Sequence, residues 1–151
     1  MQVISILVVV HILFGALWFG GPLMIGSTLK KALPVGQEAF AAATGVANRM
    51  SVLGLVGNVG SLLTGVGLIF LKYGGMKGLP VPLHAALGLV TLGLVLGIVL
   101  VKNQVGTLAA DAAGGSFDAA AALKRTKRVS MGVGMSHLLW IIALVLMYAG
   151  R

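Results

Sequence analysis

Four long apolar segments dominate this sequence and limit the folds that it can adopt. They cover about 3–25, 51–71, 83–101 and 129–149, and each is close to the roughly 20 helical residues that cross the hydrocarbon core of a bilayer. Hydrophobic residues make up 58% of the chain and charged residues 9%, with a mean hydropathy of +1.06, which is far from a soluble globular domain. We predict one all-α domain over residues 1–151, a four-helix transmembrane bundle.

The first apolar segment has the charge order of a membrane anchor. Signal peptides carry positive charge before their apolar core, whereas here Gln2 precedes the core and Lys30 and Lys31 follow it. Small residues at 39–43 would suit signal peptidase, so a cleaved leader is the alternative. We expect an uncleaved helix.

Basic residues gather at one end of the expected bundle. Eight of the 11 Lys and Arg residues follow the first and third spans or precede the second and fourth, and three lie at the other end. The positive-inside rule then places both termini on the non-cytoplasmic side of a bacterial inner membrane. Because the charge is spread over helix ends without a reader motif, nucleic acid is excluded as a partner and membrane lipid is expected.

Helix-breaking and capping residues indicate that the helices extend beyond the membrane on the cytoplasmic side. The first helical pattern continues past the membrane and stops at Pro34, and Gln37 begins the second. Ser116, with Asp118 two residues later, is expected to cap a fourth helix that begins near Phe117. Alanine-rich stretches beside these loops would form the walls of the extension.

Small residues indicate where the helices approach one another. Gly54 and Gly57 share one flank of the second helix with Ser61 and Thr64, and Gly93 and Gly97 form a small-x-x-x-small pair on the third. Such residues let membrane helices pack closely.

Two of the three histidines are predicted to lie inside the bilayer. His11 would be roughly 12 Å and His137 roughly 18 Å below the same surface, at 1.5 Å per helical residue, whereas His84 would lie near the interface. An ionisable side chain in hydrocarbon needs a partner, so it marks a candidate functional site.

A shared cofactor is one interpretation of His11 and His137. Haem iron takes axial imidazole ligands, and a four-helix bundle offers an apolar slot for the macrocycle. Helical spacing places residues that could line such a slot on one face of the first helix and on one face of the fourth. They are His11, Gly15, Trp18 and Pro22 on the first and Gly134, His137, Trp140 and Ile141 on the fourth. Alternatively, each imidazole is neutral and hydrogen-bonded to a carbonyl or hydroxyl of the next helix.

The sequence offers fewer residues suited to other metal sites or to a proton-coupled carrier. The chain has no cysteine, and no Asp or Glu lies in a predicted span, which argues against structural zinc, a di-iron carboxylate centre and a proton-coupled carrier. Copper could be held by histidine with Met131 and Met135. Asn58 is the strongest other polar group in the second span, where it would bond across helices or reach a cofactor. No catalytic residue is assigned, and a cofactor would carry any catalysis.

Several motifs together resemble a known family. These are HILFGALWFGG at 11–21, the Asn48-Arg49 pair at the start of the second helix, LHAALGLVTLGLVLG at 83–97 and KRTKR at 124–128. They resemble the copper-resistance D-type membrane domain and its relatives, among them the bacterial membrane-bound protoporphyrinogen oxidase, a small b-haem protein. The resemblance implies His11 as a haem ligand, Trp18 as a cofactor-packing residue and Arg49 as a partner for a propionate or substrate carboxylate.

Two classes of function follow from these features. The first is a membrane haem b protein of electron transfer or oxidoreduction, with a quinone or a protein as redox partner, with His11 and His137 as metal ligands, and with Trp18, Arg49, Asn58 and His84 as further cofactor-binding candidates. The second is a non-catalytic subunit of a larger respiratory or photosynthetic complex; a copper-handling protein is also possible. A homo-oligomer or a subunit of a complex is expected.

Overall fold

The computed structural model describes residues 2–114 and 117–150, which form an all-α fold. In chain order the helices are α1 (Gln2–Gly20), α2 (Ile25–Ala32), η1 (Leu33–Val35), α3 (Gln37–Tyr73), η2 (Met76–Gly78), α4 (Val81–Leu96), the π-helical η3 (Gly97–Lys102), α5 (Asn103–Ala113) and α6 (Ala119–Ala149). They form four long segments, Gln2–Val35, Gln37–Tyr73, Val81–Ala113 and Ala119–Ala149, each long and apolar enough to cross a membrane. The predicted all-α four-helix bundle is confirmed.

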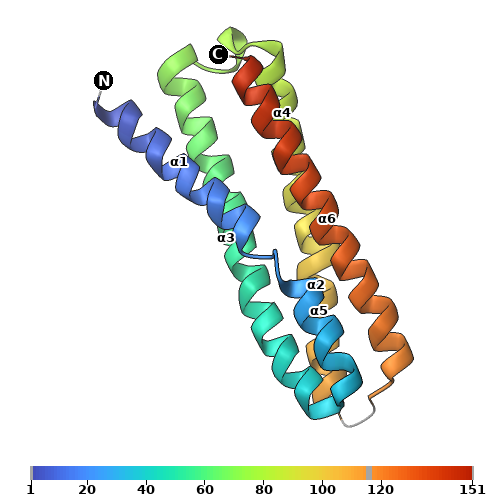
Figure 1. The fold of residues 1–151 in the computed structure, drawn as a ribbon. Helices are drawn as coiled ribbons and strands as arrows, with labels where there is room; N and C mark the ends of the chain where they lie inside the picture. Colours follow the sequence, from blue (N-terminus) through green and yellow to red (C-terminus); the bar gives the residue numbers. More distant parts are fainter. Residues whose placement is uncertain (1, 115–116, 151) are drawn as a thin grey trace.

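The four segments run side by side and alternate in direction, so both chain ends lie at one end of the bundle (Figure 1). We call this the terminal end. The opposite end carries Lys30, Lys31 and the basic start of α6, and we call it the basic end. α1 packs chiefly against α3, and α4 packs chiefly against α6. The N-terminal half of α1 leans away from α6 (Figure 1), so the two helix pairs are less close at the terminal end.

The first helical segment is broken at residues 21–24, which the sequence analysis did not predict. Pro22 has no N–H for the helical ladder, and its carbonyl accepts a turn hydrogen bond from Ile25 N–H at 3.1 Å. The proline ring packs on α3, where a Cβ added to Gly54 would lie 2.9 Å from the ring. A helix to Gly20 followed by a turn therefore replaces the single predicted helix, and Pro22 lies in this turn rather than on the helical face predicted for it.

Glycines of α3 allow the close crossing of α1. A Cβ added to Gly57 would collide with the backbone nitrogen of Trp18, and one added to Gly60 would collide with the Phe14 ring. The predicted close approach along this flank is confirmed. On α4, a Cβ at Gly93 would lie 2.7 Å from the Trp18 ring.

Gly97 differs from Gly93 because no atom lies within 4 Å of a Cβ added there. It begins the π-helical segment η3, a wider turn that the sequence did not predict. The predicted Gly93/Gly97 pair therefore makes a close contact at Gly93 alone.

An apolar core holds the bundle together toward the basic end. Its buried members come from α2, α3, η3, α5 and α6, and they are Ile25, Leu29, Phe40, Ala43, Ala47, Val101, Val105, Leu108, Ala112, Ala122, Val129 and Val133. Four of these members are alanines, so the described parts of the alanine-rich stretches are helical and pack one face into this core. This core extends the bundle beyond the predicted spans.

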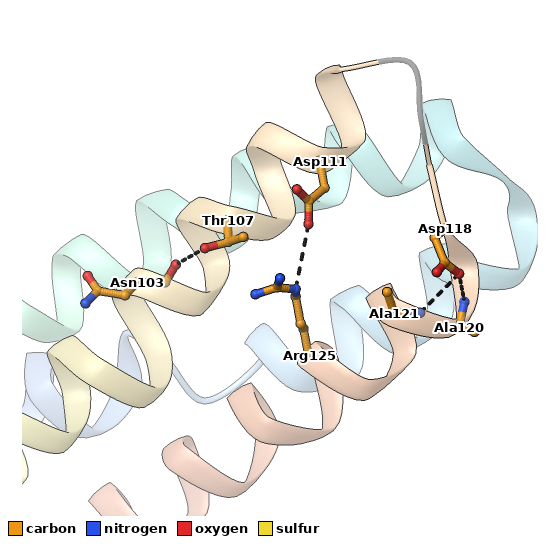
Figure 2. A network of polar contacts seen from close by, with 7 residues as sticks. All are labelled: Asn103, Thr107, Asp111, Asp118, Ala120, Ala121 and Arg125. Atoms are coloured by element: carbon orange, nitrogen blue, oxygen red, sulfur yellow. Dashed lines mark hydrogen bonds and ion pairs between the residues drawn. The ribbon is translucent and has the colours of Figure 1, made fainter.

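Asp118 caps α6 at the basic end. Its carboxylate accepts hydrogen bonds from the backbone N–H groups of Ala120 at 2.8 Å and Ala121 at 3.2 Å (Figure 2). The helix therefore begins at Ala119, two residues after the predicted start; Ser116, the predicted cap, lies outside the described residues.

An ion pair also joins α5 and α6 at this end. Arg125 Nε lies 3.7 Å from Asp111 Oδ2 (Figure 2). Because both side chains are well exposed, at 36% and 51%, this pair contributes at most about 1 kcal/mol. The apolar core and the cap therefore hold this end together.

Candidate functional site

Two apolar cavities lie between the four long helical segments in the half of the bundle nearer the terminal end. The larger has a volume of about 500 Å³ and the smaller about 230 Å³. Both are lined by His11 of α1, Ser61 of α3, Val90 of α4 and Met147 of α6, and we call the two together the His11 cleft. The larger cavity alone falls within the roughly 300–1,000 Å³ typical of ligand pockets.

The hydrogen bonds of His11 fix its tautomer. Its Nδ1 lies 2.9 Å from Thr64 Oγ1, and the Thr64 hydroxyl donates its own proton to the Gly60 carbonyl at 2.6 Å. Oγ1 is therefore the acceptor, and His11 Nδ1–H donates. The Thr64 hydroxyl also lies 3.2 Å from the Ser61 carbonyl, a second acceptor for its proton. A neutral imidazole protonated at Nδ1 carries its lone pair on Nε2, the atom through which it could bind a metal.

The local sequence of α3 explains this placement of His11. A threonine inside a helix commonly donates to the carbonyl one turn earlier, which leaves the Thr64 oxygen free to accept. The next residue, Gly65, has no side chain, and a Cβ there would lie only 3.2 Å from His11 Cε1. The Thr64-Gly65 pair thus both orients the imidazole and makes room for it.

Trp18 lines the larger cavity and is fixed by contacts with the other three long helical segments. It is 4% exposed, packs over Gly93 and donates its Nε1–H to Ser136 Oγ at 3.1 Å. With the amide oxygen of Asn58 turned toward its two neighbouring donors, Asn58 accepts from Leu94 N–H and shares the Trp18 Nε1–H with Ser136 Oγ; each of these two contacts of Asn58 is 3.2 Å long. Asn58 therefore bonds across helices, one of its two predicted roles, and it does not line the His11 cleft.

His137 lies in a different environment from His11. Its Nε2–H donates to the backbone carbonyl of Phe19 at 2.8 Å, and its ring packs against the Phe19 ring with centroids 4.4 Å apart. The Phe19 ring also packs against the Trp140 ring, with centroids 4.9 Å apart. His137 is thus hydrogen-bonded to a backbone carbonyl of another helix, as expected if it does not bind a cofactor.

The structure does not bring the two intramembrane histidines together in one cavity. His137 is not among the residues that line the His11 cleft, and Phe19 is eight residues from His11, or about 12 Å along α1. Joint ligation of one iron would require His137 to leave the Phe19 carbonyl. Joint ligation itself stays a prediction.

His84 and Arg49 lie away from the His11 cleft. His84 is exposed at the start of α4 and lies with Nδ1 3.4 Å from the Pro80 carbonyl. Arg49 is exposed on α3 toward the basic end, 15 residues or about 22 Å before Thr64. Neither lines either cavity, so a cofactor in the cleft would not reach Arg49.

The sequence analysis did not name Lys72, Tyr73 or Met147 among its cofactor-binding candidates, although all three line the His11 cleft. Lys72 and Tyr73 line the smaller cavity, and Met147 lines both cavities. Lys72 could have been recognised as a candidate, because it is the basic residue in the last turn of α3. Met147 carried no such signal, since methionine in a membrane helix is usually packing material.

The described residues contain no group of three or more His, Cys, Asp or Glu side chains that could hold a metal ion. Met131 and Met135, considered for copper, are 54% and 42% exposed on α6 and do not line the His11 cleft. A porphyrin supplies four of the iron ligands itself, so a single imidazole is enough to hold haem iron.

The fold and the cleft define a class of protein: a four-helix bundle whose helices are each long and apolar enough to cross a membrane, with an apolar cleft lined by one imidazole. Comparison with known proteins goes no further, because no family model, no curated protein and no solved structure matches the chain.

Proposed function

We propose that this protein is an integral membrane haem b protein of electron transfer or oxidoreduction, in which His11 Nε2 binds the iron. The observation that carries the proposal is the pairing of His11 with Thr64 beside the His11 cleft. A histidine that binds a metal through one nitrogen usually donates its other N–H to a fixed acceptor, and Thr64 is such an acceptor.

The lining of the cleft fits a haem. Its walls are almost entirely apolar, with Val90, Leu62 and Met147 among the lining residues, and they would exclude water from the macrocycle. Trp18 offers a rigid aromatic surface, because three helices hold it. Met147 lines both cavities and could help to hold the haem, since methionine sulfur binds haem iron in cytochromes.

In this proposal the haem supplies one-electron chemistry, and the protein supplies ligation, orientation and a dry environment. The electron partner would be a membrane quinone or a redox protein at the membrane surface. α1, α3 and α6 have exposed apolar residues, which in this proposal would contact lipid or further subunits. No residue of the chain is assigned an acid, base or nucleophile role.

We also propose that the basic end faces the cytoplasm of a bacterial inner membrane and that both termini lie outside. The support is the gathering of Lys30, Lys31 and the Lys and Arg side chains of α6 at that end. The chain has no cysteine, so Lys77→Cys and Lys124→Cys variants give single labelling sites. A membrane-impermeant maleimide applied to intact spheroplasts should label the Lys77 position alone; labelling of the Lys124 position alone would reverse the orientation.

The haem proposal is tested by the absorption spectrum of the detergent-purified protein and its variants. We expect a b-type Soret band in the wild type, its loss in His11→Ala and its retention in His84→Ala, which removes a histidine outside the cleft. His137→Ala should also keep the band if His11 is the only protein ligand, because His137 bonds to Phe19; loss of the band in this variant would support the joint ligation that the sequence predicted. A colourless wild-type protein that copurifies with larger subunits would refute the haem proposal and support a structural subunit.

A further inference from the structure

The charges of the chain are divided between the two ends of the bundle. All three acidic side chains, Glu38, Asp111 and Asp118, lie on or next to helix ends at the basic end. Lys72 and Lys77 lie at the terminal end, at the end of α3 and in η2. No Asp or Glu side chain of the protein is therefore available to pair with Lys72.

Lys72 lies where the His11 cleft meets the terminal end. It lines the smaller cavity together with Tyr73, Leu83 and Met147, and its side chain is exposed. Its Nζ lies 5.1 Å from the centre of the Tyr73 ring. A cation thus lies at the mouth of an otherwise apolar cavity.

The spacing along α3 between Thr64 and Lys72 suits one orientation of a bound molecule. Thr64, the partner of His11, and Lys72 are on the same helix, eight residues or about 12 Å apart. A molecule that fills the cleft beside His11 would have its inner edge against apolar side chains and its outer edge near Lys72. The chemistry that matches is a flat apolar body with a carboxylate on one edge.

We infer that Lys72 is the anchor for the carboxylates of the bound cofactor, which therefore enters with its propionate edge toward the terminal end. This inference rests on the proposed haem function. It also assigns the role of propionate partner to Lys72, whereas the family resemblance implied Arg49, which lies about 22 Å from Thr64 along α3. An alternative role for Lys72 is that of an interfacial anchor for the helix end.

The inference can be tested by binding titrations on the full chain, prepared without haem in detergent. Two probes are compared, haemin and its dimethyl ester, in which the carboxylates are blocked. Each is titrated into the wild type, Lys72→Gln, Lys72→Arg and the control Lys77→Gln, which removes the same charge at the same end but outside the cleft. The Soret absorbance gives the dissociation constants.

We expect Lys72→Gln to weaken haemin binding about fivefold at low salt, as for a partly exposed charge pair, and Lys72→Arg and Lys77→Gln to bind like the wild type. This loss of affinity should be smaller in 1 M salt, because the Debye length there is only roughly 3 Å and the charge attraction is screened. The dimethyl ester should bind Lys72→Gln and the wild type equally.

Three results would overturn the inference. Equal haemin binding by Lys72→Gln and the wild type would leave Lys72 as an interfacial anchor while the haem function stands. An equal loss for haemin and its ester would show that the substitution alters the cavity and not a carboxylate contact. A wild type that binds neither probe would refute the haem function itself, and the inference with it.

Discussion

Replacing Gly57 by alanine tests the close crossing of α1 and α3, on which the position of the His11 cleft depends. The added Cβ would collide with the backbone nitrogen of Trp18 and would lie 2.8 Å from the carbonyl oxygen of Phe14. Both are backbone atoms, so no side-chain rotation can relieve the overlap. The helices would have to separate, which would also shift Trp18 within the cleft.

The size of the effect can be separated from helix propensity with a matched control. Overpacking typically costs about 1–3 kcal/mol, whereas a glycine-to-alanine change in a helix gains up to about 1 kcal/mol. Gly45 lies in the same helix, is exposed and has nothing within 4 Å of an added Cβ. Gly45→Ala therefore has the propensity gain without the collision.

The free energy of unfolding of both variants can be measured by titrating the detergent-solubilised protein with SDS and following circular dichroism. We expect Gly57→Ala to be about 1–3 kcal/mol less stable than Gly45→Ala. If Gly57→Ala proved as stable as Gly45→Ala, the close contact between α1 and α3 would be wrong, and the cleft geometry would have to be revised.

Three further predictions concern single side chains. Thr64→Val removes the acceptor of His11 Nδ1–H and should weaken haem binding roughly 10- to 100-fold in a Soret titration, while Thr64→Ser should not; wild-type affinity in Thr64→Val would refute the role of the hydroxyl. Trp18→Phe leaves the buried Asn58 amide without one donor and should lower the free energy of unfolding by about 1–3 kcal/mol. An unchanged free energy of unfolding in an SDS titration would contradict this hydrogen bond. Asp118→Ala removes the α6 cap and should cost about 0.5–2 kcal/mol; unchanged hydrogen-exchange protection at Ala120 and Ala121 would contradict the capping role.

The helices themselves could be predicted because hydropathy and length depend on each segment alone. The start of α3 at Gln37 and the close approach at Gly57 were also predictable, since they follow from local residue types. The π-helical turn at Gly97–Lys102 was not, because nothing in its sequence distinguishes it from the helix around it. The turn at Pro22 could have been predicted from a proline that follows two glycines, but the hydropathy of the segment led to the prediction of one continuous helix.

The relation between the two intramembrane histidines could not be predicted from the sequence. Counting residues gives a depth only if the helices are parallel, whereas α1 leans away from α6 at its N-terminal half (Figure 1). Counting residues also does not show which neighbouring helix a side chain faces. In the structure His137 bonds to Phe19 and His11 bonds to Thr64. The sequence predicted that His11 is an intramembrane polar site, but Thr64 and Lys72 became candidates only through their positions around the cleft.

Locating the iron tests the central claim most directly. Anomalous diffraction at the iron absorption edge, from crystals of the protein purified with its native cofactor, would place the metal without assumptions about the ligand. The account predicts one iron peak in the His11 cleft, within coordination distance of His11 Nε2, with Nδ1 still bonded to Thr64. An iron peak bound elsewhere, or crystals of the native protein with no iron signal, would contradict it.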